Sequence, residues 1–100
     1  MGNTVENKQV HFIKGGTPTK SLATFITASA VEENLESITM RAVGAGAVNQ
    51  MVKGIITAEG RLMEKGIGIT YKMSYKDILT PDGTRVSAIQ TSVKFHRIIS

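Results

Sequence analysis

Residues 41–53 read RAVGAGAVNQMVK and join an apolar strand to an amphipathic helix through a loop that is almost free of side chains. A junction of this kind brings backbone N–H groups and a helix N-terminus close to an anion. Glycine adopts backbone dihedrals that are closed to other residues, while alanine leaves room for a partner's surface. We therefore expect an anion-binding junction that suits phosphate better than catalysis. Its candidate residues are Arg41, Gly44, Ala45, Gly46, Asn49, Gln50 and Lys53.

The chain before this junction predicts a strand followed by a helix. Residues 9–14 form the expected strand, and residues 15–19 (GGTPT) break it. Apolar residues then recur at helical spacing, which predicts a helix from Pro18 to about Glu33. Thr17 is the expected N-cap of this helix, because a proline is well tolerated in the first helical position.

Residues 37–43 alternate apolar and polar side chains, which predicts a second strand. After the glycine loop, an apolar stripe from Val48 to Met63 predicts a long amphipathic helix. Gly54 and Gly60 weaken this helix by roughly 1 kcal/mol each relative to alanine unless close packing requires them. Two glycines on one helix therefore indicate a close neighbour, for which a second subunit is one candidate.

The last third of the chain predicts a β-hairpin. Residues 67–76 alternate cleanly, and residues 80–83 (TPDG) have the composition of a tight turn. Residues 84–98 form the return strand, although their apolar phase shifts near Ala88. A β-bulge or burial on both faces would explain this shift. We expect the hairpin to project beyond the body of the protein.

The order strand, helix, strand, helix, strand, strand predicts an α+β two-layer sandwich. In this β-α-β-α-β-β arrangement, two helices lie on one face of a four-stranded mixed sheet. One hundred residues make one domain, which we expect over residues 9–100 after a flexible N-terminal segment at residues 1–8. A domain of this size buries a limited share of its surface, so a homodimer is a natural way to cover more.

Composition narrows the classes of function. The net charge of +4 favours a polyanionic partner. The absence of cysteine excludes disulfides and thiolate nucleophiles and fits a reducing cytoplasm. No apolar run approaches the roughly 20 residues that span a bilayer. His11 and His96 lack metal-ligand spacing, and neither a nucleophile motif nor a carboxylate pair is present. We expect a cytoplasmic non-enzyme without metal or cofactor, associated with the nucleoid if it binds DNA.

Residues 42–50 (AVGAGAVNQ), followed by Val52 and Lys53 and by residues 58–60 (AEG), resemble the stage V sporulation protein S (SpoVS) family. This family belongs to the Alba superfamily of small nucleic-acid-binding proteins. The resemblance implies a homodimer that presents the loop before the first helix, the glycine loop and the terminal hairpin to a duplex. Lys14 and Lys53 resemble lysines of the family at the first loop and on the second helix. The residues that resemble the SpoVS signature are Gly44, Ala45, Gly46, Asn49 and Gln50.

The leading hypothesis is a dimeric, sequence-tolerant nucleic-acid-binding protein with a chromatin-like or sporulation-related regulatory role, and with DNA rather than RNA as its ligand. Binding would be mainly electrostatic, through phosphate contacts. Thr17 belongs to the same expected surface. The cations of this surface are Lys14, Lys20, Arg41, Lys53, Lys72, Lys76 and Arg85.

The aromatic residues fall on apolar phases of the predicted elements, so we expect core packing rather than stacking on bases. They are Phe12, Phe25, Tyr71, Tyr75 and Phe95.

Two other functions remain open from the sequence. Archaeal Alba proteins carry an arginine inside the glycine loop, where this chain has Ala45. That difference motivates a regulatory module that keeps the fold but contacts protein instead of nucleic acid. A third possibility is a sensor that holds a phosphorylated small molecule at the N-terminus of the second helix.

Overall fold

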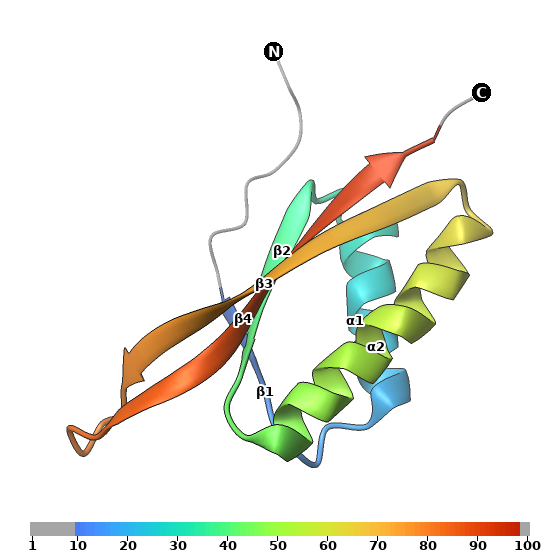
Figure 1. Cartoon of the computed structure of the whole chain (residues 1–100). Helices are drawn as coiled ribbons and strands as arrows, with labels where there is room; N and C mark the ends of the chain where they lie inside the picture. Colours follow the sequence, from blue (N-terminus) through green and yellow to red (C-terminus); the bar gives the residue numbers. More distant parts are fainter. Residues whose placement is uncertain (1–9, 99–100) are drawn as a thin grey trace.

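The computed structural model describes residues 10–98, which form one four-stranded sheet and two helices (Figure 1). The sheet order is β1-β2-β4-β3, with β1 parallel to β2 and the other neighbours antiparallel. The predicted order and fold class are confirmed, while the flexible segment expected at residues 1–8 lies outside the described residues. The elements are β1 (Val10–Ile13), α1 (Thr19–Val31), β2 (Ser37–Ala42), α2 (Ala45–Met63), β3 (Ile67–Leu79) and β4 (Arg85–Arg97).

The core lies between the two helices and one face of the sheet (Figure 1). Along β2 every second residue is buried, as the alternation in the sequence predicts. These β2 side chains pack with apolar residues from both helices and from β4. We call the opposite face of the sheet the open face, because none of the described elements covers it. The largest fully buried apolar side chains are Ile26, Ile38, Met40, Met51, Ile55, Leu62 and Val93.

Gly54 lets α1 and α2 approach each other closely. A Cβ atom placed on Gly54 would lie 2.6 Å from Cδ2 of Leu22, which is itself buried in the core. By contrast, a Cβ on Gly60 would meet no atom of the described residues within 4 Å. The close neighbour expected from these glycines is therefore α1 of the same chain at Gly54, while a second subunit at Gly60 stays a prediction.

The two glycines make a matched pair of substitutions. We expect Gly54→Ala to lower the free energy of unfolding by about 1–3 kcal/mol, because Leu22 has little room to move. Gly60→Ala is expected to raise the free energy of unfolding by about 0.5–1 kcal/mol, since alanine has a higher helix propensity than glycine at an exposed position. Urea unfolding followed by circular dichroism measures both. Equal effects of the two substitutions would contradict this packing.

The hairpin projects beyond the rest of the sheet, as predicted. The ladder between β3 and β4 runs without a break from Ile67↔Arg97 to Leu79↔Arg85, whereas β2 reaches only to Ala42↔Ile89. Residues 76–88 therefore have no partner in β2, and we call them the hairpin arm. The continuous ladder rules out the bulge considered near Ala88.

Burial on both faces of β4 explains the phase shift instead. Ala88 is fully buried, and in a continuous strand it faces the opposite way from Thr91 and Val93, which are also fully buried.

The tip of the hairpin arm is the predicted tight turn. The Gly83 N–H donates to the Thr80 carbonyl at 2.9 Å, and Gly83 has a φ of 89°, in the region that favours glycine. The Asp82 carboxylate accepts hydrogen bonds from the Thr80 hydroxyl and, at 3.1 Å, from the Thr84 N–H. The Thr80 hydroxyl, and after it the Thr84 N–H, hold the pKa of Asp82 below its usual value. The turn is thus best braced when Asp82 is ionised.

Candidate nucleic-acid interface

The N-termini of both helices lie at one end of the molecule. Strands β1 and β2 are parallel and each leads directly into a helix, so α1 and α2 begin at the same edge of the sheet (Figure 1). We call residues 14–20 and 43–50 the loop end. The positive ends of two helix dipoles meet there, which favours an anion.

The two segments of the loop end touch through glycine. A Cβ on Gly46 would lie 3.8 Å from Cα of Gly15, and a Cβ on Gly15 would lie 3.8 Å from the Ala47 nitrogen. The side chain of Gln50 ties the segments together, because its Nε2 donates to the Thr17 carbonyl at 2.6 Å. Gln50, expected as a direct contact, is thus engaged within the protein and positions the two loops.

The second helix begins earlier than expected, at Ala45. Gly44 is the N-cap, and its φ of 90° confirms the glycine-specific dihedral expected there. Gly46, by contrast, lies inside the helix and not among the residues of positive φ, so the same expectation is wrong for Gly46. Most of the glycine-rich segment is the first turn of α2 and not a loop.

Thr17 does not cap α1, which corrects another expectation. The N-cap of α1 is Pro18, and Thr17 Oγ1 instead accepts a hydrogen bond from the Lys14 N–H at 3.1 Å. The Thr17 N–H donates in return to the Lys14 carbonyl at 3.0 Å. Thr17 therefore closes the turn that presents Lys14.

Neither helix has a side-chain cap or an acidic residue in its first turn. The first N–H groups of a helix have no partner within the helix, so at the loop end they are left as donors for solvent or a ligand. Lys14 and Lys20 are exposed beside them, and Asn49 and Lys53 are exposed further along α2. This end of the molecule therefore combines backbone donors with exposed positive charges.

The hairpin arm lies next to the loop end. Ala42, the last residue of β2, pairs with Ile89, the first residue of β4 beyond the arm. Lys76 pairs with Ala88 and Arg85 with Leu79, so the two cations occupy opposite faces of the ladder. Both are exposed.

Arg41 lies apart from the loop end although it adjoins the glycine-rich segment in sequence. Arg41 lies between the buried residues Met40 and Ala42 of β2, so its side chain faces the open side of the sheet. There its Nε donates to Gln90 Oε1 at 2.7 Å, and its guanidinium lies 6.0 Å from the centre of the Phe12 ring. Lys72 also faces this side, as does Lys94, which sequence reasoning did not single out.

The expected burial of the aromatic residues is wrong for three of them. Phe25 and Phe95 pack with the core, but Phe12 is 57% exposed, Tyr71 49% and Tyr75 81%. Phe12 lies on the open face, while the two tyrosines occupy the helix-facing phase of β3, which is an edge strand of the sheet.

Two further features of residues 10–98 concern metal ions and membranes. That part of the chain holds no group of three or more side chains able to ligate a metal ion. None of its helices is long and apolar enough to cross a membrane.

Comparison with known proteins identifies the fold class and the family of this chain. The chain is similar in structure to Alba from Thermoplasma volcanium, with a TM-score of 0.59 at 14% sequence identity, over 86% of this chain and 99% of the Alba chain. The protein thus has the small α+β fold of the Alba class. The family model for Stage V sporulation protein S (SpoVS) matches residues 9–96, and the chain belongs to this family. No curated protein matches it in sequence as a relative.

Proposed function

We propose that this protein is a homodimer that binds duplex DNA with little regard to base sequence and acts as a chromatin-like or regulatory factor in sporulation. The loop end carries the proposal, because two helix N-termini without side-chain caps meet there beside exposed Lys14 and Lys20. The name of the SpoVS family and the similarity to an Alba structure support the role and the ligand.

Phosphate recognition follows from this geometry. Lys14, Lys20 and Lys53 neutralise phosphates, and the helix N–H groups donate to phosphate oxygens. The hairpin arm, with Lys76 and Arg85 on its two faces, extends along the duplex and enters a groove. Contacts to phosphates carry no sequence information, so binding is tolerant of sequence.

An apolar flank supports the second subunit. On α2, Val48, Val52 and Ile56 recur every four residues, on the side away from Gly54 and its contact with α1. Next to them, a hollow of about 310 Å³ is lined by Val48, Met73, Ser74, Tyr75 and Ile89.

Large apolar side chains are exposed along this flank. Ile56 is 58% exposed and Tyr75 is 81% exposed, and β3 is an edge strand of the sheet. A second copy of the chain covers such a surface through a two-fold interface.

Ile56→Glu is expected to convert the dimer to a monomer, because a carboxylate in the apolar flank would be desolvated twice in a two-fold interface. Size-exclusion chromatography with light scattering measures the mass. Thr57→Glu is the control, because Thr57 is the neighbour of Ile56 but is not one of the residues of the apolar flank. Its hydroxyl donates a hydrogen bond to the Lys53 carbonyl within α2. A wild-type monomer, or an Ile56→Glu dimer, would reject this interface.

Fluorescence anisotropy with two unrelated DNA duplexes at low salt tests the proposed ligand. Saturable binding of both duplexes with similar affinity is expected. Failure to bind either of them would end the proposal.

The exposed Val43 and Ala45 favour a protein-binding regulatory module as the second candidate function. They place apolar surface at the start of α2, where an Alba protein has an arginine. If DNA binding fails, a pull-down with the wild-type protein as bait tests this alternative. A protein partner is expected to bind the wild-type bait and not a Val43→Asp, Ala45→Asp variant, which is the control.

A further inference from the structure

The open face of the sheet is basic at its centre. Strand positions that face this side carry Arg41 on β2, Lys94 on β4 and Lys72 on β3, with Lys76 of the hairpin arm further along the same phase of β3. No Asp or Glu occupies an open-face strand position within residues 10–98, because the strand carboxylate of Asp77 lies on the opposite phase. Unlike a solvated face of mixed sign, this surface has one sign of charge and complements an extended anion.

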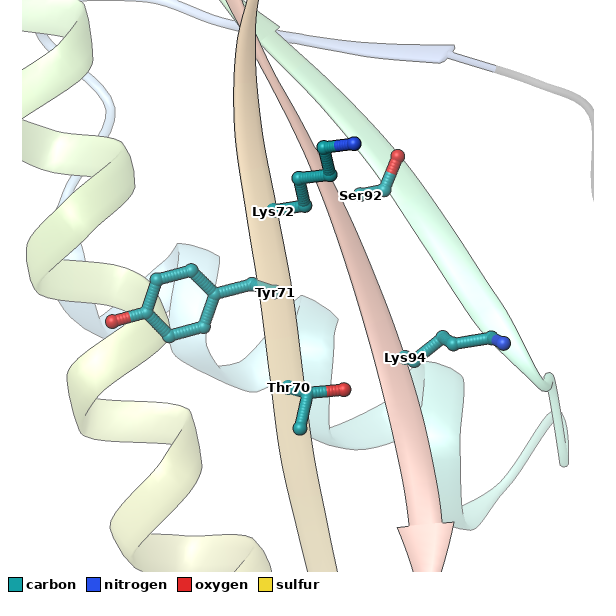
Figure 2. Close-up of a pocket in the computed structure, with 5 residues that line it drawn as sticks. All are labelled: Thr70, Tyr71, Lys72, Ser92 and Lys94. Atoms are coloured by element: carbon teal, nitrogen blue, oxygen red, sulfur yellow. The ribbon is translucent and has the colours of Figure 1, made fainter.

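Lys72 and Lys94 border a shallow hollow of about 290 Å³ (Figure 2). Figure 2 shows Thr70, Lys72, Ser92 and Lys94 on the same side of β3 and β4, while Tyr71 points the other way, toward α2. Lys72 pairs with Ser92, and Lys94 pairs with Thr70, so the two lysines are diagonal neighbours about 7–8 Å apart at the backbone. Each lysine is thus paired across the ladder with a residue that carries a hydroxyl group.

Arg41 and Phe12 supply a flat surface on the same face. The hydrogen bond from Arg41 Nε to Gln90 Oε1 fixes the guanidinium plane near the exposed Phe12 ring. An aromatic ring and an arginine plane are the groups on which unpaired bases stack. In a duplex the base faces are already stacked on each other, so Phe12 selects a single strand.

Hydroxyl groups accompany the cations across this face. Thr39 on β2, Ser92 on β4 and Thr70 on β3 occupy neighbouring open-face positions. The Thr70 hydroxyl is hydrogen-bonded to His96 Nε2 at 2.7 Å, so Thr39 and Ser92 are the hydroxyls that face a ligand. A hydroxyl both donates and accepts hydrogen bonds, as does the ribose 2′-hydroxyl, which is the group that distinguishes RNA from DNA.

We propose that the open face binds single-stranded RNA, with Lys72 and Lys94 on successive phosphates and a base stacked on Phe12 beside Arg41. This surface is separate from the loop end, and the inference does not depend on duplex binding there.

Anisotropy titrations of the full chain with labelled oligouridine at about 0.1 M salt test the inference. A single-strand phosphate contact is worth about fivefold under these conditions, so Lys72→Glu with Lys94→Glu is expected to weaken RNA binding by about 25-fold or more. Phe12→Ala is expected to weaken it about 5- to 150-fold through lost stacking. Circular dichroism verifies that each variant is folded, and the control is Lys65→Glu, an exposed lysine after α2.

Duplex DNA and single-stranded oligodeoxyuridine are the comparison ligands. The open-face variants are expected to change duplex affinity by a few-fold at most, as Lys65→Glu does, whereas Lys14→Glu with Lys53→Glu keeps RNA affinity and loses the duplex. RNA binding that survives the open-face substitutions, or an equal affinity for oligodeoxyuridine, would overturn the inference. Duplex binding without RNA binding rejects the inference alone, and RNA binding without duplex binding rejects the proposed function alone.

Discussion

Lys14→Glu combined with Lys53→Glu is expected to reduce duplex affinity by about 4,000-fold or more at 0.1 M salt, since each phosphate contact is worth about eightfold there and a dimer loses four. Each single substitution removes two contacts, so it is expected to cost about 60-fold. Lys14 is held at the loop end by the turn that Thr17 closes, and Lys53 extends the basic surface along α2. Anisotropy titrations with a labelled duplex measure both effects.

The matched control is Lys65→Glu. Lys65 is exposed just after the C-terminus of α2, at the far end of the helix from the loop end, and its substitution changes the net charge by the same amount as Lys14→Glu alone. Its effect on affinity is expected to be a few-fold at most. Equal losses from Lys65→Glu and Lys14→Glu would show that net charge alone governs binding, with no localised surface.

Charge reversal on the hairpin arm is the second large effect. A ribbon lying in a groove meets a phosphate wall on each side, and Lys76 and Arg85 lie on opposite faces of the ladder. Lys76→Glu and Arg85→Glu are therefore each expected to weaken duplex binding by about 60-fold, from one contact per protomer. The same anisotropy titration compares them with the Lys65→Glu control.

The two single variants also distinguish between placements of the arm. If the arm lay flat against one DNA strand, only the cation facing that strand would matter. A large loss for one variant with none for the other would contradict insertion into a groove. Wild-type affinity for both would remove the arm from the interface.

Much of the fold could be predicted because its signals are local. The period-two alternation of β2 and β3 and the TPDG turn each depend on residues that are close in sequence. The start of α2 at Ala45 could not, because the segment of alternating glycine and alanine has neither an apolar period nor a capping side chain. Its helical state comes from packing, as the burial of Ala47 indicates.

The candidate site was predictable only in part, for a related reason. Alternation separates the two faces of a strand but does not say how far a helix covers either one. Tyr75 therefore follows the apolar phase of β3 and is still exposed, beyond the cover of α2. Arg41 illustrates the converse, since nearness in sequence to Gly44 does not determine which way a strand residue faces.

The partners of Gln50 depend on long-range geometry as well. The residue matches a family signature, but its bond to the Thr17 carbonyl joins segments that are distant in sequence. No local pattern in the sequence distinguishes such a bracing role from a direct contact with a ligand.

The most direct test of the central claim is the salt dependence of duplex binding by the wild-type protein. With Lys14, Lys20 and Lys53 of both protomers on phosphates, six contacts predict a slope of log K against log salt of about −5, and engagement of the hairpin arms makes it steeper. Binding that does not change with salt, or no binding at low salt, would contradict the account.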